Sequence, residues 1–189
     1  MIELIVLTAM AGQGTPATFP LADIDLKSVS QDYGSPKKDR SVDGNALSIG
    51  GRAFSSGLGT HARSMIRLTL DRKAERFGAW VGVDDESAEK GSVQFVVRLD
   101  GKTAFDSGVM RGSMAAKRVD LSLRGVRRMQ LIVEDAGDGI DHDHANWAEA
   151  VFVLGQGSRP VAEVFKPEPT MPIATRIPDR ARFNGPRVV

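Results

Sequence analysis

Apolar and polar residues alternate along several short stretches of this 189-residue chain, and this alternation constrains the fold more than any other feature. In residues 64–70, for example, Ile66, Leu68 and Leu70 all fall on one side. A period of two residues is typical of a β-strand with one buried face and one solvated face. The stretches predicted as strands are 64–70, 77–83, 92–99, 117–123, 129–133 and 151–154. No stretch keeps a helical period of 3.6 residues, so the sequence predicts an all-β protein.

Turn signals separate the predicted strands. Asp43-Gly44, Asp100-Gly101 and Asp138-Gly139 supply residues that tolerate positive φ. Asp100-Gly101 lies between Leu99 and Lys102 and predicts a two-residue hairpin. Many short strands with turns at this spacing indicate an antiparallel β-sandwich.

Composition divides the chain into three parts. The predicted sandwich occupies residues 20–155. Residues 156–189 are rich in proline, which fixes φ and removes a hydrogen-bond donor, so we expect an extended linker that leads to a further module. Residues 1–19 are apolar and then small, and two readings stay open for them: a signal-peptide remnant or a first strand.

Charge excludes several classes of partner. The chain carries 25 Lys and Arg against 24 Asp and Glu, a net charge of +1, and the two signs are mixed along the sequence. A nucleic-acid-binding protein needs a basic patch, and a peripheral membrane protein commonly has a polybasic segment. We therefore expect no nucleic-acid partner and no membrane partner. The absence of cysteine excludes a disulfide framework.

A set of short motifs occurs in a fixed order between residues 21 and 154. The motifs are Asp39–Gly44, Ile49–Gly51, Gly57–Ala62, Val81–Asp85, Gly91–Val93, Asp100–Lys102, Ser107–Val109, Gly137–Gly139 and Asp143–Ala148. Each motif is weak alone, but the ordered set resembles the NPCBM domain, which is also grouped as carbohydrate-binding module family 51. The usual Asp-His-Ala-Asp-Trp of that family is Asp-His-Ala-Asn-Trp here, with Asn146 in place of a carboxylate.

This resemblance implies a galactose-binding-like antiparallel β-sandwich of the jelly-roll type. It also implies a non-catalytic module that binds galactose-type glycans and is attached to a bacterial glycoside hydrolase, such as an α-galactosidase-like protein. Such a module would be secreted, periplasmic or on the cell surface. A structural calcium ion is a further implication, with Asp39 and Ser41 as ligands from an early loop and Glu149 near the last strand.

The densest polar cluster of the sequence lies in residues 135–144, where we expect a loop at one edge of the sandwich. Sugar recognition needs planar hydrogen-bonding groups and an aromatic face. The predicted carbohydrate-binding residues are His61, Asp84, Asp85, Asp138, Asp141, His142, His144, Asn146 and Trp147. Three structural readings stay open: Trp147 packs in the core, His61 is a buried hydrogen-bonded side chain, and the paired carboxylates are solvated loop charges.

Two other functions stay open. The first is a structural or protein-interaction domain that has lost its sugar site, because sandwich folds serve many roles. The second is a metal-dependent hydrolase that uses His142 and His144 with Asp141 or Asp143, since a His-x-His pair can bind zinc when a third ligand joins it.

Overall fold

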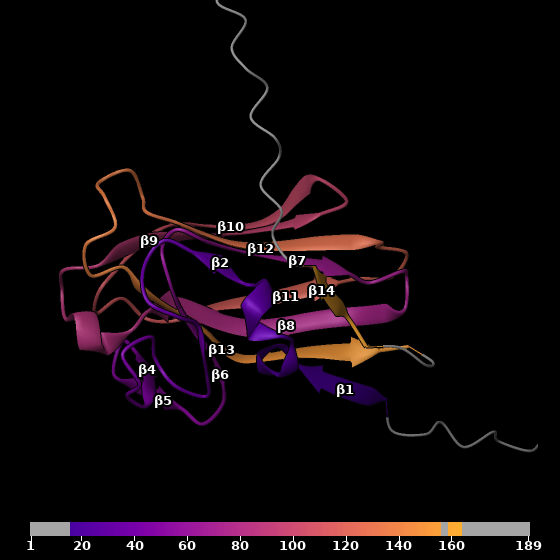
Figure 1. Cartoon of the computed structure of the whole chain (residues 1–189), viewed down its shortest axis with the longest axis horizontal. Coiled ribbons are helices and arrows are strands. Elements are labelled where there is room, and N and C mark those ends of the chain that lie inside the picture. The colour runs from indigo at the N-terminus through magenta and orange to yellow at the C-terminus, as the bar shows by residue number, and fades with distance from the viewer. Residues whose placement is uncertain (1–15, 156–158, 164–189) are drawn as a thin grey trace, which may run out of the picture.

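The structure is a computed structural model that describes residues 16–155 and 159–163. Most of the segment read as a signal remnant or first strand, and most of the predicted linker, lie outside the described residues. The described chain forms two antiparallel sheets packed face to face (Figure 1). The prediction of an all-β antiparallel sandwich is therefore confirmed.

The first sheet has six strands. Its order is β11 (Lys117–Ser122), β8 (Ala74–Val83), β13 (His144–Leu154), β6 (Gly57–His61) and β3 (Lys37–Lys38), with β1 (Ala17–Pro20) paired to β13. The second six-stranded sheet has the order β10 (Lys102–Arg111), β9 (Ser92–Leu99), β12 (Arg128–Glu134), β7 (Ser64–Thr69) and β14 (Val161–Glu163), with β2 (Ser30–Gln31) paired to β7. A separate hairpin joins β4 (Leu47–Ile49) to β5 (Arg52–Phe54).

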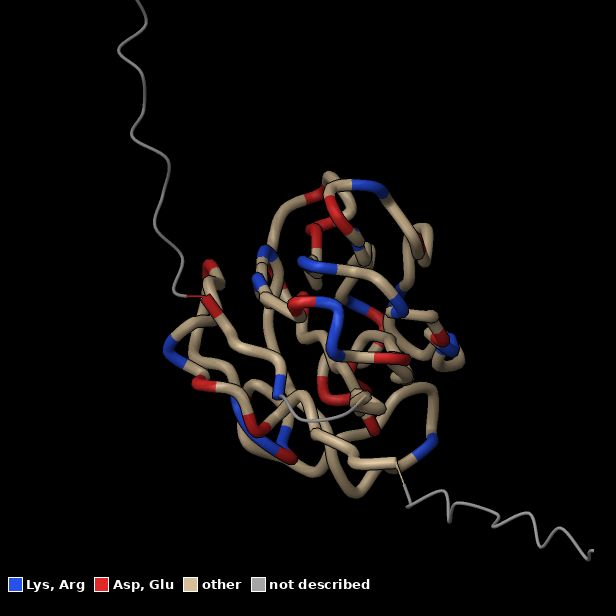
Figure 2. The backbone as a smooth tube through the Cα atoms, turned by 90° about the vertical axis from the view of Figure 1, so that its right-hand side faces the viewer, with Lys and Arg blue, Asp and Glu red and all other residues tan. Residues whose placement is uncertain are grey.

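Helical structure in the described residues is limited to three short 3-10 turns: η1 (Leu21–Asp23), η2 (Leu26–Ser28) and η3 (Asp85–Ser87). The described part of the chain contains no helix with the length and apolarity that a membrane crossing requires. On the end of the sandwich that faces the viewer in Figure 2, Lys and Arg are interspersed with Asp and Glu.

The core lies between the two sheets and is formed by the inward-facing residues of the alternating stretches. Ile66 and Leu68 are each 1% exposed, as the alternation in residues 64–70 predicts. Trp147 of β13 lies in the same core, where its indole meets the ring of Phe95 edge to face, with centroids 5.0 Å apart. Removal of this apolar surface from water is the main favourable contribution to folding.

A local sequence signal places the turn between two long strands of the second sheet. The hairpin between β9 and β10 turns at Asp100 and Gly101, both at positive φ, as predicted. β10 itself has no simple alternation in sequence because its pairing with β9 shifts register twice. The predicted linker differs from expectation at one point: residues 161–163 form β14, which extends the second sheet along the edge of β7.

Gly59 of β6 allows a close approach of two backbone segments. A Cβ atom at this position would lie 2.2 Å from Arg40 O and 2.7 Å from the carbonyl carbon of Ser41. Both neighbours are backbone atoms, so a side-chain rotation cannot relieve the overlap. Gly59 therefore allows the loop that contains Ser41 to lie directly against the sheet.

We predict that Gly59→Ala lowers the free energy of unfolding by about 2–4 kcal/mol, because the backbone of residues 40–41 must move. Gly78→Ala in β8 is the matched control, since a Cβ there meets the guanidinium of Arg118, which can move away. The loss at Gly78 should stay under about 1 kcal/mol. Urea unfolding measures both, and an equal loss at the two positions would contradict this explanation.

Candidate functional site

A pocket of about 370 Å³ lies where several loops meet at one end of the sandwich. Its lining residues are Tyr33, Asp43, His61, Glu86, Ile140, Asp141, His142 and His144. They come from the loop after β2, the β3–β4 loop, the end of β6, η3, and the β12–β13 loop with the start of β13. The β12–β13 loop and the turn at η3 lie at the left of Figure 1.

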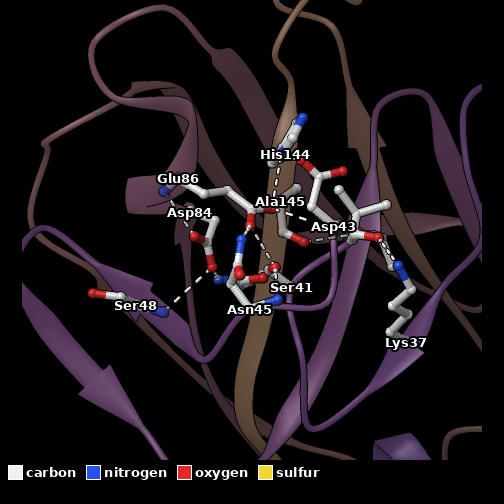
Figure 3. Close-up of polar contacts among 12 residues, drawn as sticks. Lys37, Ser41, Asp43, Asn45, Ser48, Asp84, Glu86, His144 and Ala145 are labelled. Atoms are coloured by element: carbon white, nitrogen blue, oxygen red, sulfur yellow. Dashed lines mark hydrogen bonds and ion pairs between the residues drawn. The ribbon is translucent and has the colours of Figure 1, made fainter.

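The carboxylate of Glu86 joins the segments that build the inner wall of this pocket. Oε2 accepts hydrogen bonds from Ser41 Oγ at 2.6 Å and Asn45 Nδ2 at 2.8 Å, and Oε1 lies 2.7 Å from His144 Nδ1. Figure 3 shows these groups converging on Glu86 from separate segments. Burial alone raises the pKa of Glu86, but the hydrogen bonds from Ser41, Asn45 and His144 outweigh it and hold the pKa below its ordinary value. The group is therefore a carboxylate at neutral pH.

Two of the three imidazole rings that line the pocket lie close together beside an exposed aromatic ring. The centroids of the His61 and His144 rings are 5.3 Å apart, and the ring of Tyr33 lies 4.9 Å from that of His61. His61 Nδ1 lies 2.6 Å from Ala62 O, and a carbonyl can only accept, so Nδ1 carries the hydrogen and Nε2 is free to accept. Burial lowers the pKa of His61, with a smaller contribution from His144, so the ring is neutral at neutral pH.

A second layer of polar groups lies beneath the pocket. Asp84 is 1% exposed and accepts hydrogen bonds from Glu86 N at 2.9 Å, Ser48 N at 3.3 Å and the Asn146 side chain. Burial raises the pKa of Asp84, and these hydrogen bonds partly offset the rise. Asp85 accepts from Gly50 N at 2.7 Å and Gly51 N at 2.9 Å, and so holds the β4–β5 hairpin.

The structure separates the predicted carbohydrate-binding residues into two groups. It brings His61, Asp141, His142 and His144 together around the pocket. The remaining predicted residues, Asp84, Asp85, Asp138, Asn146 and Trp147, do not line it.

Each of these remaining residues instead makes contacts elsewhere in the protein. The paired carboxylates are not solvated loop charges, because both hold backbone groups. Trp147 is 1% exposed in the core, so its indole has no face open to a sugar. Asn146 is fully buried against Asp84. Asp138 accepts from Ser92 Oγ at 2.7 Å and 2.8 Å outside the pocket.

A regular strand through His142 and His144 would place both imidazoles on one face, which would favour the hydrolase hypothesis. His142 instead precedes β13 and has a φ of 65°, so the strand alternation does not extend to it. Asp143, one of its two proposed carboxylate partners, is 1% exposed, and Oδ1 accepts from Ser92 N at 2.8 Å. The structure therefore does not assemble the predicted His-x-His site.

A different group of side chains could hold a metal ion. In the described part of the chain, ligand atoms of Asp43, Glu86 and His144 lie within 4.8 Å of one another. Glu86 already receives hydrogen bonds from three side chains, and calcium favours six to eight oxygen ligands rather than an imidazole nitrogen. This donor set therefore fits calcium poorly.

The residues predicted to bind calcium are also divided. Asp39 and Glu149 line a common pocket of about 360 Å³ beside β1, together with Asp23 and Lys38. Ser41 is fully buried elsewhere, where its hydroxyl bonds to Glu86. Two of the three predicted ligands thus lie together.

Sequence reasoning missed Tyr33, Asp43, Glu86 and Ile140 among the pocket residues. Tyr33 was the most accessible to such reasoning, because an aromatic side chain in a polar loop has no core to fill; it is 57% exposed. Glu86 follows the predicted pair Asp84-Asp85 directly, but nothing in the local sequence indicates its partners, which are 41 to 58 residues away.

Asp143 connects the pocket loop to the core, and its environment makes its ionisation unfavourable. Burial raises its pKa to about 6, the hydrogen bond from Ser92 N opposes this rise, and the charges of Asp138, Asp135 and Asp141 add to it. Between the ordinary pKa of 3.8 and about 6, the folded protein keeps a proton that the unfolded chain has lost. Stability contributed by this group is therefore lost as the pH rises through that window.

We predict that Asp143→Asn removes this pH dependence, because the amide keeps the acceptor for Ser92 N without an ionisable group. The free energy of unfolding of the wild type relative to the variant should fall by up to about 3 kcal/mol as the pH rises from about 4 to 6, and stay constant above. Urea unfolding across this range measures the difference. If the free energy of unfolding of the wild type relative to the variant stays constant, or grows with pH, ionisation of Asp143 costs the folded protein little.

Comparisons with known proteins agree with this fold and place the chain in a family. The profile of the NPCBM/NEW2 domain matches residues 17–153. Alpha-1,3-galactosidase B of Akkermansia muciniphila is 37% identical over 136 residues, which cover 68% of this chain and 17% of that enzyme. The chain thus spans about a sixth of the length of this curated relative.

Solved structures of carbohydrate-binding modules are similar as well. The CBM51 module of the Clostridium perfringens GH95 protein, in complex with methyl-galactose, is 35% identical, with a TM-score of 0.68 over 72% of this chain and 100% of that one. The CBM51-2 and INT domains of Clostridium perfringens ZmpB, in complex with GlcNAc, are 32% identical, with a TM-score of 0.68 over 73% of this chain and 32% of that one. The chain therefore belongs to the NPCBM/NEW2 domain family and is a family 51 carbohydrate-binding module, a non-catalytic type of module found in glycoside hydrolases.

Proposed function

We propose that this module binds a galactose-type sugar in the pocket between Tyr33 and His144. The main support for this proposal is the combination of an exposed aromatic ring with fixed hydrogen-bonding groups in one concave site. The similar module from the GH95 protein was solved with methyl-galactose, and the ZmpB module with GlcNAc, which supports a single sugar residue as the ligand. A pocket of about 370 Å³ has room for one.

The chemistry of the pocket suits sugar hydroxyl groups. His61 Nε2 and the carboxylates of Asp43 and Asp141 accept hydrogen bonds from hydroxyl donors. The ring of Tyr33 offers a face against which the C–H groups of a sugar can pack. The acceptors give orientation, and the ring contributes burial of apolar surface.

We predict that Tyr33→Ala weakens binding of methyl-galactoside roughly tenfold, because the sugar loses its aromatic contact. Tyr33 is 57% exposed, so folding should be unaffected. Val161→Ala, an exposed apolar truncation on β14, is the control and should bind like the wild type. Isothermal titration measures the three dissociation constants. Unchanged affinity in Tyr33→Ala would place the sugar elsewhere.

We further propose that the module has no catalytic activity of its own and serves an attached glycoside hydrolase of a bacterium, in the secreted, periplasmic or cell-surface location inferred from the sequence. The similar galactosidase, of which this chain covers 17%, supports the attachment. The proline-rich segment 156–189 would connect the two parts, and of this segment only residues 159–163 are described.

We also propose that calcium is held by Asp39 and Glu149 beside β1. Glu149 lies in a bulge of β13 with a φ of 47°, which turns its side chain out of the regular strand alternation. Asp39 uses Oδ1 to accept from Gly57 N at 3.0 Å, which leaves Oδ2 for a ligand. Carboxylates and backbone carbonyls are the ligands that calcium prefers. Ser41 is not included, because its hydroxyl is committed to Glu86.

We predict that calcium raises the melting temperature of the wild-type protein after chelator treatment and that Glu149→Gln abolishes the increase, because a carboxylate ligand is lost. Glu89→Gln, an exposed change outside this pocket, should keep it. Differential scanning calorimetry with and without calcium measures the shift. The same calcium response in Glu149→Gln and the wild type would rule out this site.

A further inference from the structure

We propose that the sugar pocket selects its ligand by charge: it accepts a neutral hexose, binds a hexose that carries an ammonium group more tightly, and disfavours a hexose that carries a carboxylate. This inference rests on the proposed function and specifies the class of sugar that the same pocket takes. It follows from which charged groups line the pocket and from where the surrounding cations are bound.

The charges that line the pocket are of one sign. Asp43, Glu86 and Asp141 contribute carboxylates, whereas no lysine or arginine is among the described lining residues. Asp141 and Asp43 are exposed, so their carboxylates face the solvent that a sugar would replace. The hydrogen bonds from Ser41, Asn45 and His144 hold Glu86 in its charged form despite its burial.

The N–H groups of His61 and His144, two of the three lining histidines, do not reverse this sign. His61 Nδ1 donates to Ala62 O, away from any ligand, which leaves Nε2 as an acceptor. His144 Nδ1 is directed to Glu86, and Figure 3 shows the far end of its ring pointing away from that carboxylate. An anionic group on a sugar would thus meet carboxylates and a nitrogen lone pair.

Two cations near the pocket loops are engaged with other groups. Lys37 Nζ donates to Val42 O and lies outside the pocket lining. Arg63 pairs with Asp32 at 3.0 Å and with Asp135 at 3.7 Å, so one positive charge faces two carboxylates. Neither cation is placed to offset the charges of the lining.

The size of the effect follows from Coulomb's law. A unit charge several ångströms from two or three partly solvated carboxylates changes affinity by roughly three- to tenfold at low salt. The effect has opposite signs for an ammonium and a carboxylate at the same position of the sugar. High salt screens such exposed charges, so the difference should shrink as the salt concentration rises.

A matched series of sugars tests the inference. The ligands are methyl-galactoside, its 6-amino-6-deoxy analogue and the methyl glycoside of galacturonic acid, which differ only at C6. Isothermal titration at neutral pH and roughly 20 mM salt should give affinities in the order amine, alcohol, acid, with roughly three- to tenfold between successive members. In the same titrations at roughly 1 M salt, the differences in affinity among the three sugars should be smaller.

Two variants test which charges are responsible. Asp141→Asn removes one lining charge with little change of shape and should reduce the differences in affinity among the three sugars. Asp71→Asn removes an exposed carboxylate near Arg72 and Arg127, outside the sugar pocket, and should leave these differences unchanged. Equal binding of the three sugars, or tighter binding of the acid, would overturn this inference while leaving the proposed function intact. Absence of binding by all three sugars and by GlcNAc would overturn the proposed function and this inference with it.

Discussion

The site depends on one buried carboxylate. Glu86 receives hydrogen bonds from Ser41, Asn45 and His144, and so joins an early loop, η3 and the first residue of β13. Loops alone would not keep these segments in a fixed arrangement, because ordering each residue is opposed by conformational entropy. Hydrogen bonds to a charged acceptor are stronger than neutral ones, and in this partly buried position they are poorly replaced by water. The inner wall of the pocket is therefore fixed before a ligand arrives.

The layer below extends the same arrangement into the protein. Asp84 accepts from the backbone of Glu86 and from Asn146, and Asp85 holds the β4–β5 hairpin. A buried polar network of this kind specifies one arrangement of the chain, because each partner left unpaired would be costly. The amide at Asn146 suits this position, since a second carboxylate against Asp84 would place two like charges in a buried site. The departure from the usual family motif thus lies beneath the pocket and not among its lining residues.

Alternation of apolar residues was sufficient to predict β7, β9 and β11, because each side chain on an inner face meets the other sheet and the pattern is local. β10 was missed, because its register shifts against β9 interrupt the alternation. Trp147 illustrates the limit of that reasoning: its motif suggested a sugar contact, but its position on β13 points it into the core. Motif residues such as Asp84 and Asn146 proved to support the site from below. Tyr33 and Glu86 escaped prediction because their roles arise only when distant segments meet, and no local period or spacing carries that information.

The sugar is proposed to bind at the end of the sandwich where Tyr33, His61 and His144 meet. Chemical-shift mapping of the ¹⁵N-labelled module during titration with methyl-galactoside tests it most directly. The structure predicts that the largest shifts fall on Tyr33, His61 and residues 140–144, with little change at the far end of β7. Largest shifts around the pocket formed by Arg67, Arg128 and Glu163 would contradict it.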